Sequence, residues 1–208
     1  LLGEAGAGKT TVLAEAARRL RDGGASARFW ITSGGRLVAG LPYLGQWQAR
    51  CEEIVAELAS IGGVLCVENL LDLLASGGSD PRGSVAAFFI PYLESGELRL
   101  VVEASPSELA ACRTLLPGFA DLLRVERIDP LAGPRAVRVL ERLAEFHGVQ
   151  HGIRTDPGDE TLVAHLFRRF MPYAALPGRA AAFLGALFES ARRQRRERVG
   201  TASARAAI

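Results

Sequence analysis

Residues 3–10 read GEAGAGKT, and their types and spacing suit the binding of a nucleoside triphosphate. The three glycines let successive backbone N–H groups curl around a phosphate that side chains would obstruct. Lys9 supplies a compact charge for the β- and γ-phosphates, and the Thr10 hydroxyl suits Mg²⁺. The predicted binding residues are Gly3, Glu4, Ala5, Gly6, Ala7, Gly8, Lys9, Thr10 and Thr11.

A second stretch, VLCVEN at 64–69, bears on whether the bound nucleotide is hydrolysed. The apolar run predicts a buried strand that ends at the carboxylate of Glu68, which can hold Mg²⁺ together with Thr10. A second acid normally follows to activate water, but Asn69 stands there. An amide can orient water, yet it cannot accept its proton, and losing a general base costs about 10²–10⁴ in rate. Glu103, which ends the next predicted strand, is the nearby acid that could substitute.

Composition sets the broad class. The chain has 208 residues, of which 49% are hydrophobic and 23% charged, as in a globular protein. Its net charge of +2 argues neither for nor against nucleic acid, and we expect no nucleic-acid partner. The longest apolar stretch, residues 85–93, is too short to span a bilayer, so we expect no membrane partner. The three cysteines are widely spaced in apolar surroundings, which predicts free thiols and a reducing, cytoplasmic location.

Strands alternate with helices up to residue 130, which predicts a parallel sheet covered by helices on both faces. The predicted strands end near Leu2 and cover 27–32, 64–68, 98–103 and about 123–128. The predicted helices cover about 10–22, 46–61, 81–93 and 107–116, and residues 33–45 are predicted to be a loop. Because Leu1-Leu2 already reads as the end of a strand, we expect the domain 1–130 to be incomplete at its N-terminus. Residues 131–208 show only helical patterns and predict a small all-helical domain.

Several longer stretches resemble the Clp unfoldases and disaggregases of the AAA+ superfamily, and more narrowly the first of their two ATPase rings. They are LVAGLPYLGQWQARCEEIVAEL (37–58), GGVLCVENLLDLLASGG (62–78), FFIPYLESGELRLVVEAS (88–105) and LPGRAAAFL (176–184). The resemblance implies a P-loop AAA+ α/β fold with a helical lid and the start of a linker helix. It further implies ATP and Mg²⁺ as ligands, self-association into a hexameric ring, and a protein substrate threaded through its pore.

The same resemblance assigns roles to individual residues. Tyr43 corresponds to the pore-loop aromatic that grips the threaded chain, and an aromatic ring suits this task because it contacts many sequences. Packing of Tyr43 beside Trp47 within its own domain is the alternative. Arg179 corresponds to a lid position that could touch phosphate, although a plain helix-start arginine fits equally well. Ser105 follows Ala104 where the family has two hydroxyl residues that sense the γ-phosphate.

The chain also departs from the family pattern. Asn69 stands where the family has its catalytic glutamate, and Ala120 and Asp121 stand near its pair of finger arginines. Groups that bind phosphate are thus retained, while groups that act on water are replaced. Three hypotheses follow: an ATP-binding ring module with slow or no hydrolysis, a fully active unfolding motor, and an ATP-sensing switch that threads no protein.

Overall fold

A computed structural model describes residues 1–24, 26, 28–41, 45–155, 158–171 and 175–199. The chain divides into two compact units. The first comprises Leu1–Gly3 and Lys9–Ile128, and the second comprises Glu4–Gly8 and Asp129–Ile208. The division therefore passes through the phosphate loop as well as through the end of the predicted sheet domain.

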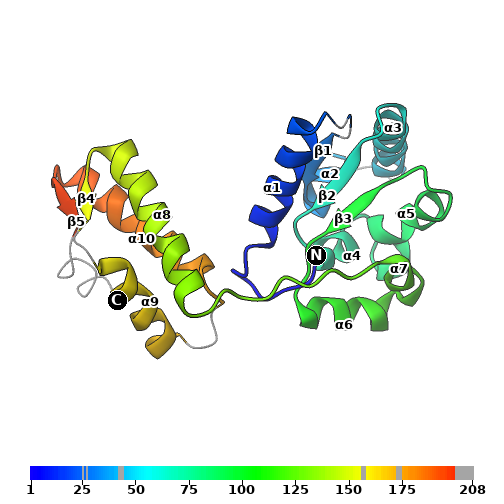
Figure 1. Cartoon of the computed structure of the whole chain (residues 1–208). Coiled ribbons are helices and arrows are strands. Elements are labelled where there is room, and N and C mark those ends of the chain that lie inside the picture. Colours follow the sequence, from blue (N-terminus) through cyan, green and yellow to red (C-terminus); the bar gives the residue numbers. More distant parts are fainter. Residues whose placement is uncertain (25, 27, 42–44, 156–157, 172–174, 200–208) are drawn as a thin grey trace. The chain divides into compact units, whose positions relative to one another are not determined.

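A parallel sheet forms the centre of the first unit (Figure 1). Its described strands are β1 (Phe29–Thr32), β2 (Val64–Val67) and β3 (Leu100–Val102), in the order β1-β2-β3. Leu2 forms parallel bridges to both Ala104 and Arg127, so the first and last predicted strands lie in the expected places but are reduced to single bridges.

The two faces of the sheet are covered unequally. Val64 and Cys66 point to one face and pack with Leu13 of helix α1 (Lys9–Asp22), whereas Leu65 and Val67 belong to the larger core on the other face. This alternation follows from the two-residue period of a strand. The larger core is built with the helices α2 (Gly34–Val38), α3 (Gln46–Ser60), α4 (Leu70–Ala75), α5 (Val85–Glu94), α6 (Pro106–Leu115) and α7 (Pro117–Leu122).

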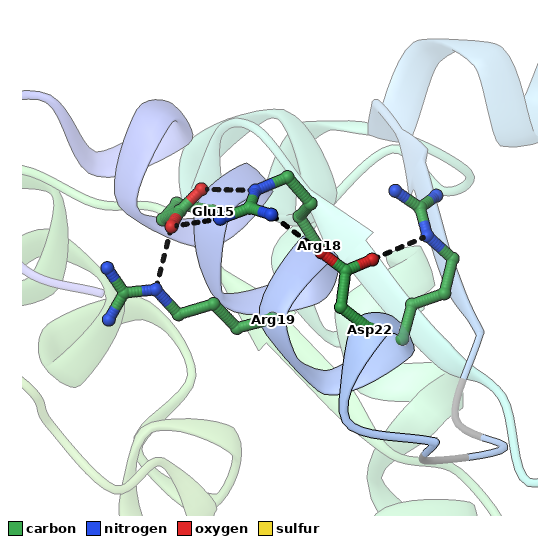
Figure 2. Close-up of polar contacts among 5 residues, drawn as sticks. Glu15, Arg18, Arg19 and Asp22 are labelled. Carbon is green, nitrogen blue, oxygen red and sulfur yellow. Dashed lines mark hydrogen bonds and ion pairs between the residues drawn. The ribbon is translucent and has the colours of Figure 1, made fainter.

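Helix α1 follows the phosphate loop and leaves some of its large apolar side chains exposed. Leu13 is buried, but Val12 and Leu20 are 44% and 45% exposed. Its outer face carries an ion-pair network in which Glu15 contacts Arg18 and Arg19, and Arg18 also contacts Asp22 (Figure 2). These pairs lie three or four residues apart, a spacing that brings side chains together on a helix.

Three short helices, α2, α4 and α7, were not predicted from the sequence. Each has five or six residues, too few to show a helical period. Capping explains two of them, because the side chains of Ser33 and Asn69 accept hydrogen bonds from backbone N–H groups in the first turns of α2 and α4. The helix predicted from residue 81 begins instead as the 3₁₀-helix η1 (Pro81–Gly83), and α5 starts after Ser84.

The second unit contains the three predicted helices, α8 (Pro134–His151), α9 (Asp159–Phe170) and α10 (Gly178–Arg193). They share a core that includes Leu140, Val163 and Leu184. The prediction of helices alone omitted a parallel pair of two-residue strands, β4 (Arg154–Thr155) and β5 (Arg198–Val199). Strands this short leave no alternating pattern in the sequence.

Candidate phosphate-binding site

The phosphate loop has the backbone conformation that its glycines predict. Gly6 and Gly8 have φ angles of 89° and 97°, in the left-handed region that favours glycine. The loop is anchored to the sheet, because the backbone N–H of Gly3 donates to the carbonyl of Ala104 at 3.0 Å. Lys9 begins α1, and its Nζ donates to the carbonyl of Gly3 at 2.8 Å. Backbone donors, a lysine and a helix N-terminus therefore converge on one segment, which suits an anion.

A contact within the second unit ties this loop to the start of α10. The backbone N–H of Gly178 donates to the carbonyl of Gly6 at 3.0 Å. A Cβ atom on Gly178 would press against the backbone of Gly6, 2.7 Å from its carbonyl oxygen. A Cβ on Gly6 would in turn lie 3.0 Å from the carbonyl oxygen of Ala175. Both positions therefore require glycine for close backbone approach, a role for Gly178 that no local sequence pattern indicates.

The hydroxyl of Thr10 is held by an acid from the sheet. Thr10 Oγ1 donates to Glu103 Oε2 at 2.9 Å. Glu103 follows β3 and is only 5% exposed. Its other oxygen, Oε1, is buried and has no hydrogen-bond partner within the described part of the chain. The structure thus brings Glu103, rather than Glu68, to the threonine of the phosphate loop.

The two residues after β2 have different surroundings. The backbone N–H of Glu68 pairs with the carbonyl of Thr32 at 3.2 Å, and its side chain is exposed. Asn69 is the N-cap of α4: its Oδ1 accepts from the backbone N–H of Asp72 at 3.0 Å. The Nδ2 of Asn69 donates to Glu108 Oε1 at 3.1 Å. Both ends of the Asn69 amide are therefore engaged in protein contacts.

Ser105 belongs to the same polar network. It is the N-cap of α6 and forms a capping box with Glu108: Glu108 N donates to Ser105 Oγ at 3.3 Å, and Ser105 N donates to Glu108 Oε2 at 2.6 Å. Glu108 thus connects the N-terminal ends of α4 and α6. The proposed roles of Asn69 and Ser105 at the γ-phosphate stay predictions, and the observed contacts explain both residue types as helix caps.

The remaining predicted residues lie in varied surroundings. Arg179 is the second residue of α10 and is exposed, so its contact with phosphate stays a prediction. Tyr43 lies outside the described residues. Ala120 is buried in α7, and Arg124 is 91% exposed and forms an ion pair with Glu126 at 3.2 Å. Ala120 is thus a packing residue, and the absence of the family's arginine pair stays a prediction from the sequence.

The residues at this site fit a magnesium ion that is bound partly by the protein and partly by the nucleotide. Among the described residues, no group of three or more His, Cys, Asp or Glu side chains could hold a metal by itself. Mg²⁺ usually keeps several waters and binds one or two protein oxygens together with substrate phosphates. The Thr10 hydroxyl and the unpartnered Glu103 oxygen meet this requirement. When bound, Mg²⁺ would neutralise charge on the phosphates.

A buried thiol lies close to the same carboxylate. Burial, and secondarily the charge of Glu103, raise the pKa of the Cys66 thiol to about 11. Burial likewise raises the pKa of Cys51 to about 11 and raises that of Cys112. All three cysteines are free and buried, as the sequence predicted. They are therefore neutral thiols at physiological pH, unsuited to nucleophilic chemistry.

The fold of this chain is that of a P-loop AAA+ domain, in which helices cover a parallel sheet. A chain of Hsp104 in a closed state with ATPyS and FITC casein matches with a TM-score of 0.78 over 99% of this chain, at 21% identity. The S. cerevisiae Hsp104-ADP complex matches with a TM-score of 0.76 over 93% of this chain, at 24% identity. The matches cover 38% and 28% of those chains, respectively.

Comparisons of sequence find similarity to ClpB chaperones. The chaperone ClpB of Corynebacterium glutamicum is 29% identical over 191 residues, and ClpB 1 of Parasynechococcus marenigrum is 26% identical over 187 residues. Each alignment covers 86% of this chain and 22% of the relative, so the chain spans about a fifth of these relatives' length. No family model matches. The chain is thus similar to Clp-type AAA+ chaperones, as the sequence motifs indicated.

Among the described residues, no helix combines the length and apolar character needed to cross a membrane.

Proposed function

We propose that this chain is the ATP-binding module of a Clp-like, ring-forming chaperone, and that it binds ATP-Mg²⁺ with slow or no hydrolysis. The observation that carries the proposal is the division of roles within the site. The loop glycines and Lys9 keep a phosphate-binding arrangement, whereas the Asn69 amide caps α4 and binds Glu108. A side chain engaged at both ends, and unable to accept a proton, is a poor activator of water.

The choice of ATP and of a ring is supported by the relatives. The matched Hsp104 structures are described with ATPyS or ADP, and one with casein. We infer that this chain assembles into a hexameric ring and that Tyr43 contacts a threaded protein substrate. Slow hydrolysis would leave the module to hold the ring together. The buried free cysteines support a reducing compartment such as the cytoplasm.

Single-turnover hydrolysis, measured beside nucleotide affinity, tests the proposal. We expect ATP binding that Lys9→Ala abolishes, and little hydrolysis in one turnover. Rapid multiple turnover would instead support an active unfolding motor. Failure to assemble with ATP in electron micrographs would support a switch that threads no protein. Absence of ATP binding at millimolar concentration would refute the proposal altogether.

A matched pair of variants tests the role of Asn69. Asn69→Glu and Asn69→Gln have side chains of the same length, and both lose the favourable cap at a cost of about 1 kcal/mol. Only the glutamate can accept a proton from water. We expect Asn69→Glu to hydrolyse ATP faster than Asn69→Gln, by up to about 10²–10⁴. Equal rates in two folded variants would show that the amide does not limit hydrolysis.

A further inference from the structure

Glu103 is a buried acid whose hydrogen bonding is incomplete. It is 5% exposed, and one of its oxygens accepts from Thr10 while the other has no partner within the described residues. A buried charge is costly unless it is paired or binds a cation. The carboxylate is therefore placed to receive a further donor or positive charge next to the phosphate loop.

The backbone fixes this position firmly. The N–H of Glu103 donates to the carbonyl of Val67 at 2.9 Å, and its own carbonyl accepts from the N–H of Leu70 at 3.1 Å. Glu103 and Glu68 thus lie at the carboxyl ends of neighbouring parallel strands, where ligands bind in open α/β sheets. Of the two acids, Glu103 contacts Thr10 and is buried, whereas Glu68 is exposed.

The hydrogen bond also orients the threonine. A hydroxyl has one proton and two lone pairs. Because Thr10 gives its proton to Glu103, its lone pairs are left for a cation. A carboxylate beside that hydroxyl can also accept hydrogen bonds from the waters that Mg²⁺ retains.

We propose that Glu103, and not Glu68, is the acid that holds Mg²⁺ beside Thr10, by accepting hydrogen bonds from the ion's water shell. This inference rests on the proposed binding of ATP-Mg²⁺. In this chain the acid that supports the metal thus follows β3 instead of β2. A purely structural role is the rival: an acid near the N-terminus of α1 would stabilise that helix without any effect on metal dependence.

The test measures the affinity of a fluorescent ATP analogue in Mg²⁺ and again in EDTA. The ratio of the two affinities reports how strongly the metal supports binding. We expect Glu103→Gln to reduce this ratio on the order of tenfold to a hundredfold, the value of a hydrogen bond to a charged group. Glu68→Gln should keep the wild-type ratio. Glu160→Gln is the matched control, because Glu160 is a similarly buried carboxylate, 9% exposed, in the second unit.

Each outcome has a defined meaning. If the wild-type protein binds no ATP under either condition, the proposed function fails. If it binds ATP equally in Mg²⁺ and EDTA, the proposed binding of ATP stands, but the role of Mg²⁺ and with it the inference about Glu103 fail. An unchanged ratio in Glu103→Gln, or a loss in Glu68→Gln alone, also overturns it. Should Glu103→Gln not fold by circular dichroism, Glu103→Asp decides: its shorter side chain withdraws the carboxylate from Thr10, so an unchanged ratio contradicts the inference.

Discussion

The contact between Gly6 and Gly178 gives the sharpest test of the structure. In Gly178→Ala, the new Cβ would press against the backbone of Gly6, 2.7 Å from its carbonyl oxygen. Neither backbone segment can give way as a flexible side chain would. We expect overpacking to lower the free energy of unfolding by about 1–3 kcal/mol. Loss of the hydrogen bond from Gly178 N–H to the Gly6 carbonyl would add about 1 kcal/mol.

Gly185 supplies a matched control on the same helix. A Cβ there would lie 3.5 Å from Nε2 of His147, an ordinary contact. Gly185→Ala should therefore raise the free energy of unfolding by about 0.5–1 kcal/mol, because alanine favours a helix interior. Urea unfolding followed by circular dichroism would compare the two variants with the wild type. Because Gly6 belongs to the phosphate loop, Gly178→Ala should also weaken ATP binding. A Gly178→Ala variant as stable as Gly185→Ala would refute the backbone contact.

Three further predictions concern stability and side-chain chemistry. Phe89 is fully buried, so Phe89→Ala should lower the free energy of unfolding by about 3–5 kcal/mol. Phe146 is 61% exposed, and Phe146→Ala should change the free energy of unfolding by less than about 0.5 kcal/mol in the same urea assay. Hydrogen bonds from Arg18 and Arg19 lower the pKa of Glu15 to about 2. The stability from these contacts should be present above pH 4.5 and be lost as the pH falls towards 2. A titration of the Glu15 carboxyl by NMR with a midpoint near 4.5 would contradict the ion pairs. The buried cysteines should resist a thiol reagent at pH 8 until the protein unfolds, and rapid reaction of the native protein would show that they are accessible.

The longer elements could be predicted because their signals are local. The buried strand at Val64–Val67 and the buried face of α3, with Cys51 and Val55, follow from apolar spacing. Short elements were missed because their stability comes from caps and packing rather than from a repeated pattern. The strand pair β4–β5 needs pairing across more than forty residues, which no local pattern can indicate.

In the candidate site, too, local features could be predicted from the sequence, whereas contacts between distant residues could not. The phosphate loop was found from sequence because its glycines and Lys9 act through their own local backbone. The environment of Asn69 was not predictable, because it depends on Glu108 from a different helix.

By itself, the sequence determined that this protein has a phosphate-loop motif, an alternating α/β domain and a resemblance to Clp proteins. Only the tertiary structure decided which acid contacts Thr10 and which glycine packs against the phosphate loop. The physical reason is distance along the chain: Glu103 lies 93 residues from Thr10, and their hydrogen bond forms only when parallel strands bring their ends together beside the start of α1.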